Sequence, residues 1–211
     1  MLLIHPPVIR PCEAPAGIAG LAGFLRSRHY PCQVVDLNLE GLRYLLETTH
    51  HSEVTDDTWT RRALKNRTAH LAQLSLWKTY RQFDRHGSAV RSLKHVLATR
   101  ASQPGVRLSL TDYEDANLLP IRSDDLIQAA KNPEGNPFYP FFAPRLSLLI
   151  ETKNPPTIGI SLNYLPQALC TFAIIGWLRK HHPKKKIVLG GGLITSWLSR
   201  PDWHSPFEGW V

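Results

Sequence analysis

Short apolar runs and helical patterns alternate along the first forty residues. Residues 2–4 form a continuous apolar run, which is typical of a strand buried on both faces of a sheet. Pro15 stands where the first turn of a helix tolerates proline, and four apolar positions at helical spacing follow it: Ile18, Leu21, Ala22 and Leu25. Residues 33–37 form a second, largely apolar run. The interval between the two runs suits a βαβ unit, whose crossover is expected to be right-handed.

The same alternation returns near the end of the chain. Residues 157–162 predict a third strand, and Pro166 opens a helical pattern that His182 and Pro183 end. Residues 187–189 predict a fourth strand, which runs directly into three consecutive glycines. We therefore expect an α/β fold built on a doubly wound parallel sheet.

Between these two parts the strand-and-helix alternation stops. Apolar residues at helical spacing predict three helices, around residues 42–46, 64–77 and 90–97. Thr111 and Glu114 have the spacing of a capping box, which predicts a helix start. Ser123 and the two aspartates after it predict another.

The patterns divide the chain into three segments. Residues 1–40 and 155–211 carry the α/β pattern, and residues 41–154 form a large, mainly helical insertion after the second strand. The aromatic, proline-rich residues 136–142 are too apolar for a solvated linker, so we expect them to pack back on the domain. Residues 210–211 have the character of a strand start, which predicts that the second part is truncated before its last strand.

Composition is ordinary for a globular protein, with 43% hydrophobic and 20% charged residues. No apolar run approaches the ~20 residues that cross a bilayer, so we expect no membrane partner and a cytoplasmic location. The three cysteines are widely spaced, which predicts neither a disulfide framework nor a metal site.

The positive charge is concentrated in one segment. The chain has a net charge of +8, and residues 61–100 hold ten lysines and arginines against one acid, Asp84. A basic surface raises a nucleic-acid hypothesis, but aromatic residues are sparse there and no known nucleic-acid-binding motif is present. We interpret the segment as a solvated face or a surface that docks an acidic domain. A basic protein or nucleic-acid interaction module stays open as an alternative.

The expected sheet directs attention to the carboxyl ends of its strands, where ligands of such folds bind. Residues 5–17, 161–167 and 190–195 follow three of those ends. The triple glycine at 190–192 would let a bulky or phosphate-bearing ligand approach the backbone, or simply form a flexible turn. Ser161 could bind a ligand or satisfy a neighbouring backbone group.

Other chemistry has little support. The dinucleotide fingerprint GxGxxG is absent, as are nucleophile, Walker and paired-carboxylate motifs. His5 ends the first strand, and we interpret it as a hydrogen-bonded structural histidine. We therefore assign no catalytic and no metal-ligating residue. A flavodoxin-like domain that binds a nucleotide or flavin stays open as an alternative.

In five segments the chain resembles the N-terminal cobalamin-binding domain of cobalamin-dependent radical SAM enzymes. These are residues 2–7 (LLIHPP), 15–22 (PAGIAGLA), 34–38 (VVDLN), 159–164 (GISLNY) with Gln167, and 187–192 (IVLGGG). Their order and spacing carry the resemblance, which covers the two α/β parts and leaves the insertion out.

The resemblance implies a flavodoxin-like, Rossmann-type sheet of five parallel strands, with cobalamin across its carboxyl ends. It implies that the nucleotide tail of cobalamin is bound by Ser161, Gly190, Gly191 and Gly192. It also implies that the corrin ring faces two loops, with the residues Pro6, Pro7, Arg10, Gly17, Leu162, Asn163, Tyr164 and Gln167.

Two departures from the wider family shape these expectations. The DxHxxG motif, whose histidine ligates cobalt, is absent, so we expect no histidine of this chain to ligate the metal. The CxxxCxxC motif of a [4Fe–4S] cluster is also absent. The cluster and S-adenosylmethionine would then belong to a radical SAM domain downstream of Val211 in the full-length chain, which would be this segment's partner. We expect cofactor binding here, and methyl transfer or related radical chemistry only in the full-length enzyme.

Overall fold

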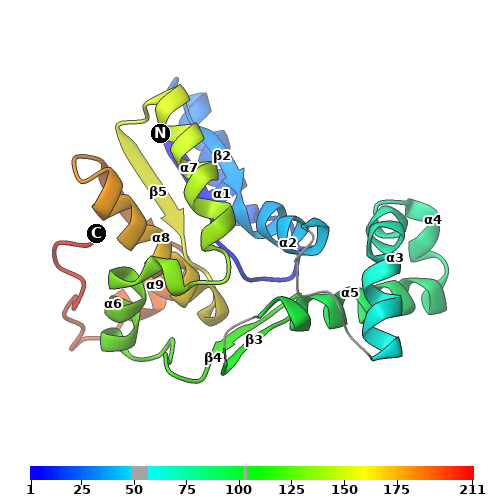
Figure 1. The fold of residues 1–211 in the computed structure, drawn as a ribbon. Helices are drawn as coiled ribbons and strands as arrows, with labels where there is room; N and C mark the ends of the chain where they lie inside the picture. The colour runs from blue at the N-terminus through cyan, green and yellow to red at the C-terminus, as the bar shows by residue number, and fades with distance from the viewer. Residues whose placement is uncertain (49–56, 102–103) are drawn as a thin grey trace.

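A four-stranded parallel sheet organises the computed structural model, which describes residues 1–48, 57–101 and 104–211. The strands are β1 (Leu2–His5), β2 (Gln33–Asp36), β5 (Thr157–Ser161) and β6 (Lys186–Gly190), in the order β2-β1-β5-β6 (Figure 1). All three pairings are parallel. The predicted α/β class and the four predicted strands are thereby confirmed.

One face of the sheet is only partly covered. Helix α1 (Ala16–Ser27) packs on β1 and β2, where Leu3, Ile18 and Ala22 form a small buried cluster. Leu21 belongs to the predicted apolar face of this helix, yet it is exposed. The reason is that α1 contacts the sheet along a narrow stripe and leaves its remaining apolar positions open.

The opposite face carries the main core. Helices α7 (Tyr139–Lys153) and α8 (Ala168–His181) cover it, and α8 is buried from Ala168 through Leu178. Phe138 and Phe142 are fully buried in this core, so the aromatic run at 136–142 packs on the domain as predicted. A short 3₁₀ helix, η2 (Leu165–Gln167), connects β5 to α8.

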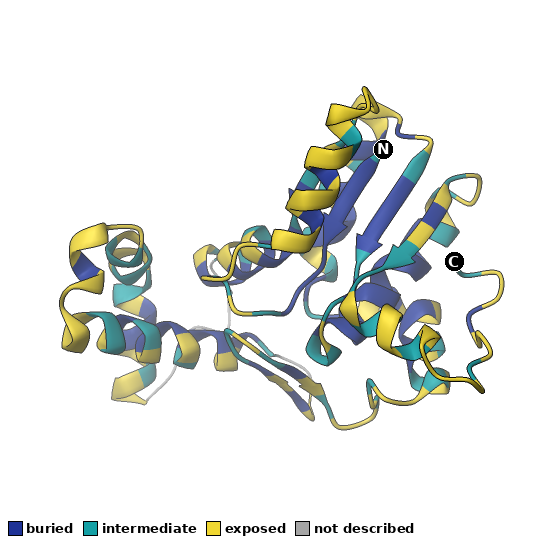
Figure 2. Cartoon of the chain, turned by 180° about the vertical axis from the view of Figure 1, so that it is seen from behind, coloured by how far each residue is buried: buried dark blue, intermediate teal, exposed yellow. Residues whose placement is uncertain are grey.

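A helical lobe follows β2 and stands away from the sheet. It contains α3 (Thr58–Leu74), α4 (Trp77–Tyr80) and the first part of α5 (Phe83–Arg100), and α2 (Leu37–Glu47) links it to the sheet (Figures 1 and 2). The predicted helices of this region are confirmed, except that Trp77 begins a separate short helix.

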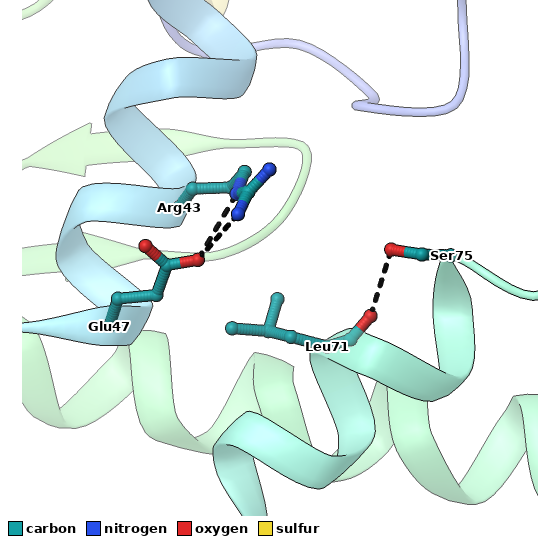
Figure 3. A network of polar contacts seen from close by, with 4 residues as sticks. All are labelled: Arg43, Glu47, Leu71 and Ser75. Carbon is teal, nitrogen blue, oxygen red and sulfur yellow. Dashed lines mark hydrogen bonds and ion pairs between the residues drawn. The ribbon is translucent and has the colours of Figure 1, made fainter.

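The lobe is attached at its base by contacts with α2. The buried Arg100 side chain donates to the Thr48 carbonyl at the end of α2 (2.9 Å). Figure 3 shows the end of α2 facing the end of α3. The polar contacts drawn there stay within each helix: Arg43 with Glu47 (2.9 Å), and the Ser75 hydroxyl with the Leu71 carbonyl (3.2 Å).

The rest of the insertion returns toward the sheet. An antiparallel hairpin of β3 (Val106–Leu108) and β4 (Tyr113–Asp115) leads to α6 (Ser123–Lys131) and the 3₁₀ turn η1 (Pro133–Gly135). The helix start predicted at Ser123 is confirmed. The helix start predicted at Thr111 is wrong, because that residue lies in the hairpin turn, where Ser109 N donates to the Asp112 carbonyl.

The chain ends against α8 and α9 (Gly192–Leu198). Trp210 lies in a turn rather than in the predicted strand start, and its carbonyl accepts a hydrogen bond from Arg179 of α8 (2.8 Å). Phe207 is buried against Phe172, with ring centroids 4.5 Å apart. Within the described part of the chain, no helix is both long and apolar enough to cross a bilayer.

Helices α6 and α8 cross at Gly176. Both helices belong to the main core, and Ala130 on α6 is buried at the crossing. A Cβ atom added at Gly176 would overlap the backbone of Ala130. Glycine is therefore required at this position for the two helices to approach.

We expect Gly176→Ala to lower the free energy of unfolding by at least ~2 kcal/mol, because backbone must shift to accept the methyl group. Chemical denaturation followed by circular dichroism measures the change. Gly23→Ala on α1 is the matched control, since a Cβ there meets no atom within 4 Å. The control should stabilise by ~0.5–1 kcal/mol through helix propensity. Equal effects of the two substitutions would contradict this packing.

Candidate functional site

The carboxyl ends of β1, β5 and β6 bring most of the predicted site residues to one edge. Ser161 lies directly beside Gly190 in the parallel register of β5 and β6. The loop after β1, which begins at Pro6, lies at the same edge because β1 pairs with β5. Three segments far apart in sequence therefore meet here, as the parallel sheet predicts.

The buried side chain of Gln167 joins two of these segments. Its Nε2 donates to the Pro6 carbonyl (2.7 Å), and its Oε1 accepts from the backbone N–H groups of Asn163 (3.1 Å) and Tyr164 (3.2 Å). The side chain is fully buried. Gln167 was predicted to face a ligand, but in this structure it fixes the two loops to each other.

Asn163 joins the ends of β5 and β6. Its Nδ2 donates to the Ser161 hydroxyl oxygen (3.1 Å), and its Oδ1 accepts from Gly192 N (3.0 Å). In the described residues the Ser161 hydroxyl donates no hydrogen bond of its own. Its proton therefore stays available to an acceptor on a ligand.

The three consecutive glycines serve different purposes. Gly191 has φ +109° and lies so close to the Leu162 backbone that a Cβ would overlap it. Leu162 N also donates to the Gly190 carbonyl (2.7 Å). Gly191 is thus required for packing between two loops, whereas a Cβ on Gly190 would meet nothing within 4 Å. Gly190, and not Gly191, opens space at the edge.

An open strip of sheet lies beside this edge. The strip lies on the α1 side of the sheet at Val188 of β6, which follows Leu3 and the buried Gly159 in the register of the strands. Val188 is 43% exposed. The α1 residues Gly17 and Gly20 are exposed, and a Cβ on either would meet nothing within 4 Å. The backbone of α1 is therefore exposed without side chains at these two positions.

His5 supplies an unsatisfied polar atom at the end of β1. The residue is 3% exposed, and its Nδ1 has no hydrogen-bond partner. Since side chains alternate along a strand, His5 lies on the same side of the sheet as Leu3, the side with the open strip. Burial lowers the pKa of His5, and the adjacent carboxylate of Asp36 offsets part of that effect. His5 was predicted to be a hydrogen-bonded structural histidine, but its Nδ1 finds no hydrogen-bond partner in the described residues.

The other predicted residues are divided between core and surface. Pro6 and Pro7 are buried, and their loop is fixed by Asn38, which exchanges two hydrogen bonds with Ile9 (2.9 and 3.0 Å). Arg10 is exposed and pairs with Glu13 (3.2 Å). Tyr164 is also exposed. A ligand at this loop would therefore meet its backbone and the exposed Arg10, and not the two buried prolines.

A cavity formed by the β3–β4 hairpin was not predicted from the sequence. A cavity of about 560 Å³ lies between this hairpin and the η2 turn, with Arg107, Tyr113, Asp115, Leu165 and Pro166 in its lining. Because η2 follows β5, the cavity lies next to the carboxyl edge of the sheet. The hairpin strands are only three residues long, so their alternation is too short to be predicted.

Tyr113 forms the boundary between this cavity and a second one of about 400 Å³ beside α6 and α8. Burial raises the pKa of Tyr113, with smaller contributions from Cys170 and Asp115. Burial also raises the pKa of the Cys170 thiol to about 12. Both groups therefore stay protonated at neutral pH. Across the described ranges, no three histidine, cysteine or acidic side chains gather in a way that could hold a metal ion.

Comparisons with family models, curated proteins and solved structures returned no match to this chain. The site must therefore be interpreted from its own geometry.

The buried His5 makes stability depend on pH. Its folded pKa is below the ordinary value of 6.5, so the unfolded chain binds the proton more readily. We expect the free energy of unfolding to fall as pH drops below ~6.5 and to level off below the folded pKa. The difference between wild type and His5→Asn, measured by denaturation across this range, isolates the contribution. His204→Asn, at an exposed histidine, should keep the wild-type slope. An unchanged slope in His5→Asn would contradict the prediction.

Proposed function

We propose that this chain is the cobalamin-binding part of a radical SAM-type enzyme. The observation that carries the proposal is the meeting of Ser161, Gly190 and the loop after β1 at one carboxyl edge, beside an open strip of sheet. The strand order β2-β1-β5-β6 agrees with the first four strands of a flavodoxin-like sheet, whose ligand lies at this edge.

The residues at the edge suit a long ligand with a phosphate and a flat base. Gly190 leaves open space next to Ser161, whose hydroxyl can donate to a ligand oxygen. Gly17 and Gly20 leave the backbone of α1 exposed without side chains. His5 Nδ1, buried and without a partner, would gain a hydrogen bond from a tail that covers it. These residues would hold the nucleotide tail.

The corrin would lie over the loops at the ends of β1 and β5. Gln167 and Asn163 fix these loops through backbone hydrogen bonds, so they offer a rigid support without turning their own polar atoms to the ligand. The β3–β4 hairpin borders the same edge, and its cavity would admit part of a large ring. When bound, cobalamin supplies a cobalt centre for methyl transfer or related chemistry.

This chain would bind only one of the cofactors that such an enzyme uses. The thiolate motif that would hold a [4Fe–4S] cluster is absent from the sequence. In our proposal the cluster and S-adenosylmethionine belong to a partner domain of the full-length protein. The role of this segment is to bind and orient the cofactor and to shield it from water.

The proposal predicts that the purified chain retains hydroxocobalamin. After incubation and desalting, an absorbance scan should show the corrin bands with the wild-type protein. Gly190→Trp should remove them, because its ring would occupy the open space beside Ser161. Gly191→Trp would be a poor test, since it would disturb the packing against Leu162.

Gly23→Trp is the matched control, because it adds the same side chain at an open glycine in the distal half of α1. It should retain corrin like the wild type. Flavin mononucleotide, incubated in parallel, should be lost on desalting. Retention of flavin without corrin, or equal corrin retention in Gly190→Trp and wild type, would contradict the proposal.

A further inference from the structure

The far end of the helical lobe exposes large apolar side chains with no packing partner in the core. We call residues 75–85, which comprise α4, the short connections on either side of it and the first three residues of α5, the lobe tip. Every residue of the lobe tip except Thr79 is exposed. Leu76 is 45% exposed, Trp77 74%, Tyr80 50% and Phe83 85%. An apolar cluster of this kind marks an interaction surface rather than an ordinary solvated turn.

The same segment is basic. Lys78, Arg81 and Arg85 alternate with the apolar residues, and the only acid of the lobe tip is Asp84. Within the described ranges, no ion pair neutralises these three cations. They belong to the segment of residues 61–100, which carries ten basic residues against one acid. The charge therefore complements an anionic partner.

The lobe tip has the position of a convex projection. Both views show α4 at the outer end of the lobe, away from the sheet (Figures 1 and 2). It lies on the turn between α3 and α5, which pack on each other and support it. Apolar side chains on a projection can enter a partner's surface without any movement of the domain.

We infer that the lobe tip docks on an anionic lipid surface. Trp77 and Tyr80 suit the headgroup region of a bilayer, where amphipathic rings collect, and Leu76 and Phe83 suit the acyl boundary beneath it. The cations between them would bind the lipid phosphates. We predicted no membrane partner because no apolar run is long enough to span a bilayer. A surface assembled from only four apolar side chains contains no such run.

Single-stranded nucleic acid fits the lobe tip less well. A platform for bases needs free aromatic faces, but Tyr80 already has two ring neighbours, Trp77 at 6.2 Å and His86 at 5.0 Å between centroids. Leu76 has no ring to offer. The experiment must therefore distinguish binding of nucleic acid from binding of lipid.

Co-sedimentation with vesicles tests the inference. We expect the protein to bind vesicles that contain roughly one-third phosphatidylglycerol about tenfold more strongly than pure phosphatidylcholine vesicles. Phe83→Ser should weaken binding to the anionic vesicles at least about fivefold. The double variant Lys78→Glu, Arg81→Glu should weaken it at least about tenfold. All three substituted side chains are exposed, so circular dichroism should show an unchanged fold.

Matched controls use exposed residues elsewhere. Phe24→Ser on α1 removes another exposed ring, and Lys184→Glu with Arg200→Glu reverses two distant charges. Both controls should bind as the wild type does. The inference would be overturned if the protein bound both vesicle types equally, or if Phe83→Ser bound anionic vesicles as strongly as the wild type. It would also be overturned if the protein bound oligouridylate but no vesicles, and Phe83→Ser abolished the oligouridylate binding. None of these outcomes bears on cobalamin retention, so the two proposals fail separately.

Discussion

Parallel pairing between β1 and β5 is the constraint on which the rest of the structure depends. It joins the first strand to a strand more than 150 residues later, and the buried Gln167 side chain adds a hydrogen bond between positions 161 apart. Buried polar groups are stable when they are paired, so this side chain fixes how the two loops lie relative to each other. The lobe and the hairpin lie in the segment between these two strands, and the cavity lies between that hairpin and η2, which follows β5.

The carboxyl edge offers mainly backbone, because its amide side chains hold the loops together. Asn163, Asn38 and Gln167 use their side chains on neighbouring main-chain groups, and Gly191 allows Leu162 to lie against it. What remains free is the Ser161 hydroxyl proton, the space at Gly190 and the unpaired nitrogen of His5. A ligand at this edge would therefore meet a rigid frame with a few open positions, which limits the ordering cost of binding.

The strands could be predicted because each is an apolar run with a clear boundary, as at residues 2–4 and 187–189. The Thr111–Glu114 spacing gave a wrong prediction, because local capping signals do not reveal that Tyr113 is buried as part of a hairpin strand. The separate roles of Gly190 and Gly191 depend on a contact with Leu162, which lies nearly thirty residues earlier and cannot be recognised from a run of glycines. The sequence thus predicted which segments meet at the carboxyl edge of the sheet, whereas tertiary contacts decide which of their residues remain open.

Nuclear magnetic resonance of ¹⁵N-labelled protein titrated with hydroxocobalamin tests most directly whether a ligand binds at the carboxyl edge beside α1, as we propose. We expect the largest chemical-shift changes at the amides of Ser161, Gly190 and Gly192, and smaller changes at those of Gly17 and Gly20. Amides of the lobe tip should stay unchanged. Perturbations centred on the lobe, or at the amino ends of the strands, would contradict the account even if the protein bound the corrin.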